Sequence, residues 1–147
     1  MNGDLDVEVS VGDGISPPVD AERVEAAVRH VLAAEGVGAA EISVALLGDD
    51  EIAALNQEYL GHEGPTDVIS FALHDEGEPP LGDVYVGVDQ ALRQAAEYGA
   101  TPADEVLRLA IHGTLHVLGY DHPRDDGRAD SEMFRRQESL LADFLAR

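Results

Sequence analysis

The sequence predicts a single α/β domain over residues 1–147, in which one mixed four-stranded sheet packs with about five helices. Three observations lead to this fold class. Segments with a strand-like alternation of apolar and polar residues are interspersed with segments whose apolar residues recur at helical spacing. A helical segment joins the first two strands, which favours a parallel pair, whereas a short segment containing Gly and Pro joins the last two, which favours an antiparallel pair. A chain of 147 residues is also long enough to bury one sizeable core.

In chain order, the predicted elements are a strand, a helix, a strand, a helix, two strands and three helices. Their ranges are 5–11, 20–36, 41–47, 49–61, 67–73, 83–88, 89–98, 101–118 and 128–146. The first strand alternates strictly between apolar and polar residues, and the later strands are short apolar runs bounded by Gly, Pro and Asp. Asp20 can cap the first helix, and the three acids at 49–51 favour the start of the second through the helix dipole.

Helical spacing also predicts which side chains face the core. In the second helix we expect Ile52, Leu55 and Tyr59 to point inward, and in the third we expect Leu92 to pack between two alanines. Thr101, followed by Pro and then by an acid, is a strong start for the fourth helix. That helix is almost wholly apolar on several faces, so it is expected to be central and buried.

Composition and charge exclude several classes of protein. The net charge is −21, from 30 acidic residues against nine basic residues that are all arginine, which argues against a general affinity for nucleic acids or anionic membranes. The absence of cysteine excludes disulfides and thiolate metal ligands, as expected of a cytoplasmic protein. The acidic start and the lack of an apolar run of about 18 residues predict neither a signal peptide nor a membrane span. Residues 108–147, with seven acids and six arginines, are nearly neutral.

Residues 112–122, His-Gly-Thr-Leu-His-Val-Leu-Gly-Tyr-Asp-His, carry the strongest functional signal. His112 and His116 lie four residues apart in a helical pattern, so that both imidazoles can bind one ion. Gly119 can end the helix and bring His122 back as a third ligand. Three protein ligands with an open fourth position are typical of a catalytic zinc site. We therefore predict one Zn²⁺ held by these three histidines, with no catalytic group identified beyond the metal-bound water.

The histidine spacing is also found in metzincin peptidases, in which a Glu directly after the first His acts as general base. In this chain that position is Gly113, which cannot transfer a proton. Asp121, next to the third histidine, either orients an imidazole or caps the turn, and it is a candidate catalytic residue. A metallopeptidase that lacks the Glu base therefore stays an alternative function.

The same residues resemble the YbeY endoribonuclease family, also known as ribosomal RNA maturation factors, whose signature is His-Gly-x-Leu-His-Leu-x-Gly-Tyr-Asp-His. The resemblance extends over about residues 40–145. Further matching positions are Asn56, Tyr59, Pro65-Thr66-Asp67-Val68-Ile69-Ser70-Phe71, Leu81-Gly82-Asp83, Met133 and Glu138. The resemblance implies a single-strand-specific, metal-dependent endoribonuclease. Such an enzyme acts in 3′-end maturation of small-subunit ribosomal RNA and in ribosome quality control, with ribosomal RNA and the small subunit as partners.

One segment departs from the family's pattern. The family usually has Arg directly after the Tyr, followed by Gly-Lys, in a segment thought to contact the RNA phosphate, whereas this chain has Leu60-Gly61-His62. Loss of both cations weakens the stabilisation of developing charge by this segment. We hypothesise that either His62, a candidate catalytic residue, or Arg124 supplies the missing positive group; the alternative for His62, which we favour, is an exposed loop residue without this role. The lost Arg also makes a ribosome-associated binding module with a structural metal a further alternative.

Several polar residues are candidates for substrate contact. Thr66, Asp67 and Arg124 are the predicted substrate-binding residues, and Ser70 is a further candidate. Asp67 and Asp83, at strand edges, either face the metal site or are simply the polar ends of their strands. The arginines between positions 124 and 136 either contact phosphate or pair with the neighbouring acids.

Overall fold

The computed structural model describes residues 4–120 and 132–147. The strands are β1 (Leu5–Val11), β2 (Ala40–Leu47), β3 (Val68–Ala72) and β4 (Leu81–Gly87). The helices are α1 (Ala21–Ala34), α2 (Asp49–Leu55), α3 (Val88–Tyr98), α4 (Pro102–Val117) and α5 (Glu132–Leu145), and a π-helical turn η1 (Asn56–Leu60) follows α2. The α/β class predicted from the sequence, with one mixed four-stranded sheet and five helices in the part of the chain that is described, is confirmed.

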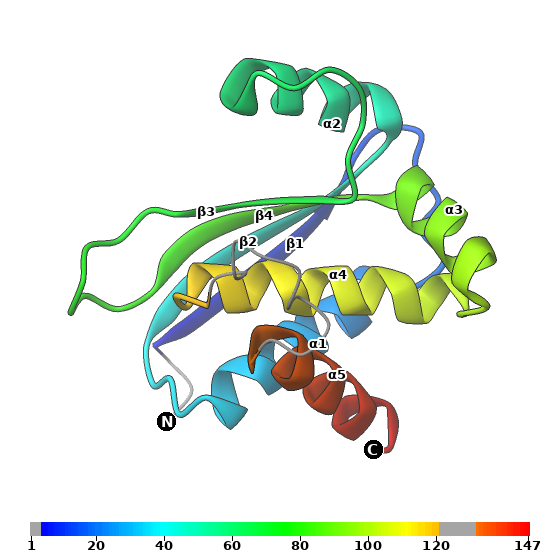
Figure 1. Ribbon diagram of the computed structural model, residues 1–147. Coiled ribbons are helices and arrows are strands. Elements are labelled where there is room, and N and C mark those ends of the chain that lie inside the picture. The colour runs from blue at the N-terminus through cyan, green and yellow to red at the C-terminus, as the bar shows by residue number, and fades with distance from the viewer. Residues whose placement is uncertain (1–3, 121–131) are drawn as a thin grey trace.

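The four strands form one sheet in the order β1-β2-β4-β3 (Figure 1). The β1–β2 and β2–β4 pairs are parallel and the β3–β4 pair is antiparallel, as the connections predicted. The register pairs Val44 with Val84 and Val84 with Ser70, so these three side chains share one face of the sheet. Successive side chains of a strand alternate between faces, so Asp83 and Tyr85 lie on the opposite face.

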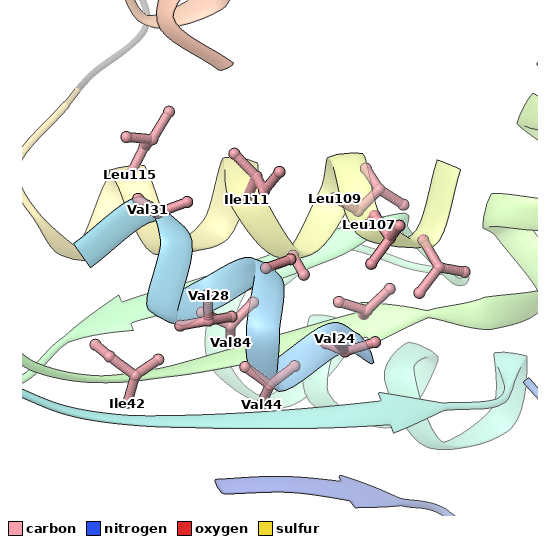
Figure 2. Close-up of a cluster of buried hydrophobic side chains, with 14 of the residues drawn as sticks. Val24, Val28, Val31, Ile42, Val44, Val84, Leu107, Leu109, Ile111 and Leu115 are labelled. Atoms are coloured by element: carbon pink, nitrogen blue, oxygen red, sulfur yellow. The ribbon is translucent and has the colours of Figure 1, made fainter. Parts of the chain in front are cut away.

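The helices cover the two faces of the sheet differently. α4 and α1 lie along one face with α5 packed against them, and α2 lies on the other face (Figure 1). Val28 of α1, Ile111 of α4, and Val44 and Val84 of the sheet belong to one hydrophobic cluster, and all four side chains are fully buried (Figure 2). Each such aliphatic side chain contributes about 1.5–3 kcal/mol relative to an exposed one, so this layer supplies much of the stability.

α4 is central, as predicted, because it contacts α1, α3, α5, β3 and β4. Thr101 caps its first turn, accepting a hydrogen bond from the Asp104 N–H at 3.2 Å. Asp20 caps α1 in the same way, accepting from the Arg23 N–H at 2.8 Å. Within residues 4–120 and 132–147, no helix is both long and apolar enough to cross a membrane.

The end of the second predicted helix differs from the α-helix that its periodicity indicated. Asn56–Leu60 form a π-helical turn, whose wider i→i+5 spacing rotates side chains relative to an α-helix. Asn56 is therefore buried, and its Nδ2 donates to the Gly64 carbonyl at 2.9 Å. The prediction that Tyr59 faces the core is wrong, because its side chain is 58% exposed and instead contacts Phe71 edge-on, with ring centroids 5.6 Å apart.

α3 also packs differently from the prediction in one residue. Leu92 is 38% exposed, whereas Val88, Ala91 and Ala95 form the buried face of the helix. Small side chains at 91 and 95 let α3 approach α4 closely, and they leave Leu92 outside the contact.

Candidate functional site

A pocket with a volume of about 950 Å³ lies along one stripe of α4. The helix contributes residues 105, 108, 109, 112 and 116, whose spacing of three and four residues places them on one side. The other walls come from the end of η1, the start of β3, the end of α3 and the first turns of α5. The pocket therefore joins five elements, and two predicted metal ligands lie in it.

His112 and His116 are neighbours in this pocket. Their ring centroids are 4.8 Å apart and the ring planes are inclined by 78°. Both side chains are half-buried and line the pocket. Neutral imidazole nitrogens held this close are suitable ligands for a zinc ion.

A chain of hydrogen bonds from α5 holds His112. Its Nδ1 lies 2.6 Å from the Gln137 side-chain oxygen, and the Gln137 amide nitrogen donates to Glu138 at 2.9 Å. Because a carboxylate only accepts hydrogen bonds, Glu138 fixes Gln137 with its oxygen towards His112. That oxygen also accepts, so His112 carries its proton on Nδ1. Its Nε2 keeps the lone pair that a metal ligand needs.

Arg108 completes this chain on the α4 side. Its Nε donates to Glu138 at 2.9 Å and its Nη1 donates to Glu105 at 2.5 Å. Burial disfavours the charged guanidinium, but the bonds to Glu138 and Glu105 outweigh burial and raise the pKa of Arg108 above its ordinary value. The ion pair with Arg108 holds the Glu138 carboxylate in the position where it accepts from Gln137.

Three predicted site residues, Asp121, His122 and Arg124, lie outside the described residues. Among residues 4–120 and 132–147, no group of three His, Cys, Asp or Glu side chains is arranged to hold a metal ion. The structure thus places two of the three predicted ligands in one pocket, and the third stays a prediction.

Asp67 and Ser70 line the same pocket as the two histidines. The Asp67 carboxylate accepts the Val68 N–H at 2.7 Å and the Gln94 side-chain amide at 3.2 Å, which fixes its orientation. Thr66 is adjacent, with its hydroxyl 3.4 Å from the Asp67 carboxylate, but it does not line the pocket. Thr66 and Asp67 are the predicted substrate-binding residues that the structure describes, and of these only Asp67 lines the pocket.

Asp83, which the sequence left as either a residue facing the metal site or a polar strand end, does not face the histidines. Gly113 of α4 packs against Val84, so the Val84 side of β4 is the side under α4. The neighbouring Asp83 points to the opposite face, where it pairs in register with Phe71. There the Tyr85 hydroxyl donates to the Asp83 carboxylate at 3.4 Å.

Gly113 sets the distance between α4 and the sheet. A Cβ atom at this position would overlap the Val84 side chain and lie 3.3 Å from Val68 Cγ2. The position after the first histidine therefore points into the sheet. It has no room for the Glu that serves as general base in metzincin peptidases.

The Leu60 side chain lines the pocket and is 46% exposed. The position at which the family usually has Arg therefore lies in the wall of the same pocket as the two histidines. Gly61, with a φ of 68°, turns the chain between Leu60 and His62. His62 is exposed and is not among the residues that line the pocket. Its proposed role as a substitute cation stays a prediction.

Glu35 joins α1 to the ends of two other helices. Its carboxylate accepts from the Tyr120 hydroxyl at 2.8 Å and from Arg136 Nε at 2.6 Å. The bond to Glu35, and to a smaller extent burial, raises the pKa of Tyr120, so the hydroxyl stays a protonated donor. Tyr120 packs against the core, and Arg136 forms an ion pair with Glu35 at the end of α1.

Sequence reasoning missed Gln137, although a signal for it exists. The buried residues of α5 are Met133, Gln137, Leu140, Leu141 and Phe144, so Gln137 is the polar member of an apolar stripe. A polar side chain at a core position requires a hydrogen-bond partner. Its partner, however, lies on another helix, and helical spacing contains no information about that contact.

Known proteins match this chain over most of its length. A family model described as Endoribonuclease YbeY matches residues 15–145. An endoribonuclease YbeY from Moorella thermoacetica is 49% identical over 122 residues, which cover 75% of this chain and 77% of that protein. The one from Chloroflexus aggregans is 43% identical over 147 residues, 92% of each chain. A solution structure from Thermotoga maritima superposes with a TM-score of 0.66 at 29% identity, over 97% of this chain and 89% of the other.

Proposed function

Because the chain belongs to the YbeY endoribonuclease family, we propose that its pocket hydrolyses phosphodiester bonds of single-stranded RNA with the help of one bound metal ion. The family and the enzyme class predicted from the sequence are confirmed by this membership. The proposed cellular role is 3′-end maturation of small-subunit ribosomal RNA and ribosome quality control. The proposed location is the cytoplasm, in contact with the small subunit.

The pair of imidazoles in the pocket carries this proposal. His112 and His116 have ring centroids 4.8 Å apart, and we assign them, with His122 as third ligand, to a single Zn²⁺. Nitrogen donors suit zinc, and the chain has no cysteine to compete with them. When bound, such an ion lowers the pKa of a coordinated water towards about 7 and polarises the phosphodiester group.

The chain's own residues prepare the pocket for this chemistry. Gln137 holds His112 in the tautomer that presents Nε2, through the 2.6 Å bond to Nδ1. We propose Asp67, whose carboxylate is already oriented by Gln94, as a substrate contact in the pocket wall. Thr66 and Arg124 are proposed as further substrate contacts, and Asp121 and His62 stay candidates for proton transfer or charge stabilisation.

Replacement of Gln137 by leucine tests the orientation of His112. Loss of the group that orients a metal-binding histidine typically lowers metal affinity by about 10–100-fold, and we expect a reduction in this range for Gln137→Leu. Zinc affinity measured by competition with a chromophoric chelator checks the expectation. Ser139→Ala, at an exposed position on the same helix, is the control. Wild-type affinity in Gln137→Leu, with an unchanged His112 tautomer in ¹⁵N NMR spectra, would contradict it.

Two other functions were left open by the sequence, a metallopeptidase and a binding module with a structural metal. A metallopeptidase is disfavoured because a side chain at position 113 would point into Val84. A ribosome-binding module with a structural metal remains consistent with Leu60 in the pocket wall. A structural site should lose its fold when the ion is removed, whereas a catalytic site should lose turnover with the fold largely retained.

The deciding experiment offers the purified protein a defined single-stranded RNA, the matching duplex and an unfolded polypeptide. Each substrate is tested after treatment with chelator and after zinc is restored, while circular dichroism follows the fold. We expect cleavage of the single-stranded RNA alone, its loss with chelator and its return with zinc. Chelator-resistant RNA cleavage, or cleavage of the polypeptide, would refute the proposal.

A further inference from the structure

Two exposed aromatic side chains line the pocket that contains the histidines. Tyr98 is 73% exposed and Phe134 is 39% exposed, and both are part of the pocket wall. Leu60, 46% exposed, is a third large apolar side chain there. Single exposed apolar residues are common on proteins, but several of them around one pocket indicate a binding surface.

The backbone holds both rings at helix ends beside the pocket. Tyr98 is the last residue of α3, because Gly99 takes a left-handed conformation with a φ of 70° and ends the helix. The Ala100 N–H then bonds back to the Ala95 carbonyl at 2.9 Å, which fixes this turn. Phe134 lies in the first turn of α5, next to the buried Met133 that anchors the helix in the core.

The ionic groups of the pocket do not favour binding through phosphates. Among the lining residues that the structure describes, Arg108 is the only arginine, and its guanidinium is bound by Glu105 and Glu138. Asp67 adds a further negative charge to the wall. A polyanion that enters this pocket therefore gains little from ion pairs with its described walls, whereas flat uncharged faces suit the two rings.

We infer that Tyr98 and Phe134 form a nucleobase-stacking subsite, which holds unpaired bases of single-stranded RNA at the edge of the pocket. The inference rests on the proposed function, since it takes RNA as the substrate of this pocket. Bases in a duplex are already stacked on their neighbours, so only an unpaired strand can place them on these rings. Every base has a flat face, so this subsite selects single strands with little preference for sequence.

Binding measurements in the presence of chelator, which separates binding from cleavage, test the subsite. The probe is a fluorescent single-stranded oligoadenylate, compared with an abasic ribose-phosphate oligomer of equal length and charge. We expect Tyr98→Leu and Phe134→Leu each to weaken oligoadenylate binding by about tenfold, and the abasic oligomer to bind at least about tenfold more weakly. Tyr98→Phe and Phe134→Tyr, which keep a ring, are the rescue variants, and Leu73→Ala, exposed and outside the pocket wall, is the control.

Salt dependence provides a second readout that a merely structural role would not produce. The measured quantity is the slope of the logarithm of the association constant against the logarithm of the salt concentration. Binding through stacking, with at most one phosphate contact, gives a slope no steeper than about −0.7, whereas binding through four phosphate contacts to a single strand gives about −2.8. A steep slope, abasic binding equal to oligoadenylate binding, or wild-type affinity of both leucine variants would overturn the subsite. Cleavage by metal-loaded enzyme is scored separately. If the wild-type enzyme cleaves RNA and both leucine variants bind oligoadenylate with wild-type affinity, the subsite alone is overturned. If binding depends on the two rings but the metal-loaded enzyme does not cleave RNA, the endoribonuclease proposal is overturned and the subsite is supported.

Discussion

Replacement of His116 by alanine is expected to abolish RNA cleavage and to lower zinc affinity by more than about 100-fold, while the protein stays folded. The affinity loss should exceed the effect of removing a group that only orients a ligand, which is about 10–100-fold. The fold should persist because His116 is half-buried and faces the pocket, whereas the core contacts of α4 come from apolar residues such as Ile111 and Leu115. Zinc titration, RNA cleavage and thermal unfolding of the metal-free protein measure the three parts of this prediction.

His74→Ala is the matched control, since it removes an imidazole from the β3–β4 connection, outside the pocket wall. It should leave zinc affinity and cleavage unchanged. His112→Ala should act like His116→Ala, because both rings line one pocket and their centroids are 4.8 Å apart. Cleavage by His116→Ala at the wild-type rate would show that the reaction does not depend on this histidine pair. Unfolding of wild-type protein when zinc is removed would instead favour a structural site.

The parts of the site that sequence predicted are those determined by local geometry. His112 and His116 are one helical turn apart, so any α-helix over this segment brings their rings together. The strands and their pairing were likewise predictable, because alternation marks a strand and connection length restricts its direction. The stripe of α4 that forms the pocket wall follows from the same periodicity.

Contacts between distant elements could not be predicted in this way. The bond from Gln137 to His112 joins residues 25 positions apart, on two helices whose relative placement depends on the whole core. Asp83 was a candidate to face the metal site because it lies at a strand edge, but the register of β4 places it on the other face. A shift of one residue in a strand exchanges its two faces, so an edge position alone does not determine which site a side chain reaches.

The segment around Leu60 differs from its prediction because its helix type changes from α to π. Helical periodicity predicted an inward Tyr59, but the π-helical turn η1 rotates the chain and buries Asn56 in its place. The bond from Asn56 to the Gly64 carbonyl, eight residues away, accompanies this turn. A period of 3.6 residues is assumed in every helical pattern, so a change of helix type cannot be detected from it.

Net charge was a poor guide to the substrate for a related reason. A value of −21 argued against nucleic acid, yet the acids Glu105 and Glu138 in the pocket wall are bound to Arg108. A count of charges treats these groups as independent, whereas the structure joins them in one hydrogen-bonded chain with Gln137. The electrostatics of a site depend on such pairings more than on the total charge of the chain.

Replacement of Gly113 by valine is expected to have the largest effect on stability of the substitutions considered. A side chain there would enter the space of Val84, and overpacking of a core typically costs about 1–3 kcal/mol, so we expect a value near 3 kcal/mol. For a domain of this size, that loss corresponds to a decrease in melting temperature of about 6–12 °C. Thermal and urea unfolding of the metal-free protein measure it.

For Gly113→Ala, the sign of the change in unfolding free energy is more informative than the size of the loss in Gly113→Val. In the interior of a helix, Gly to Ala normally stabilises by about 1 kcal/mol, so a loss of stability at position 113 would show that the contact with Val84 outweighs helix propensity. Gly38→Ala, at a site with open space and an ordinary φ, is the control and should change little. Both Gly113 variants should also lower zinc affinity, because displacement of α4 from the sheet disturbs the contact between His112 and Gln137 of α5, which orients this ligand. Stabilisation by Gly113→Ala would mean that α4 is not held to the sheet by this close approach.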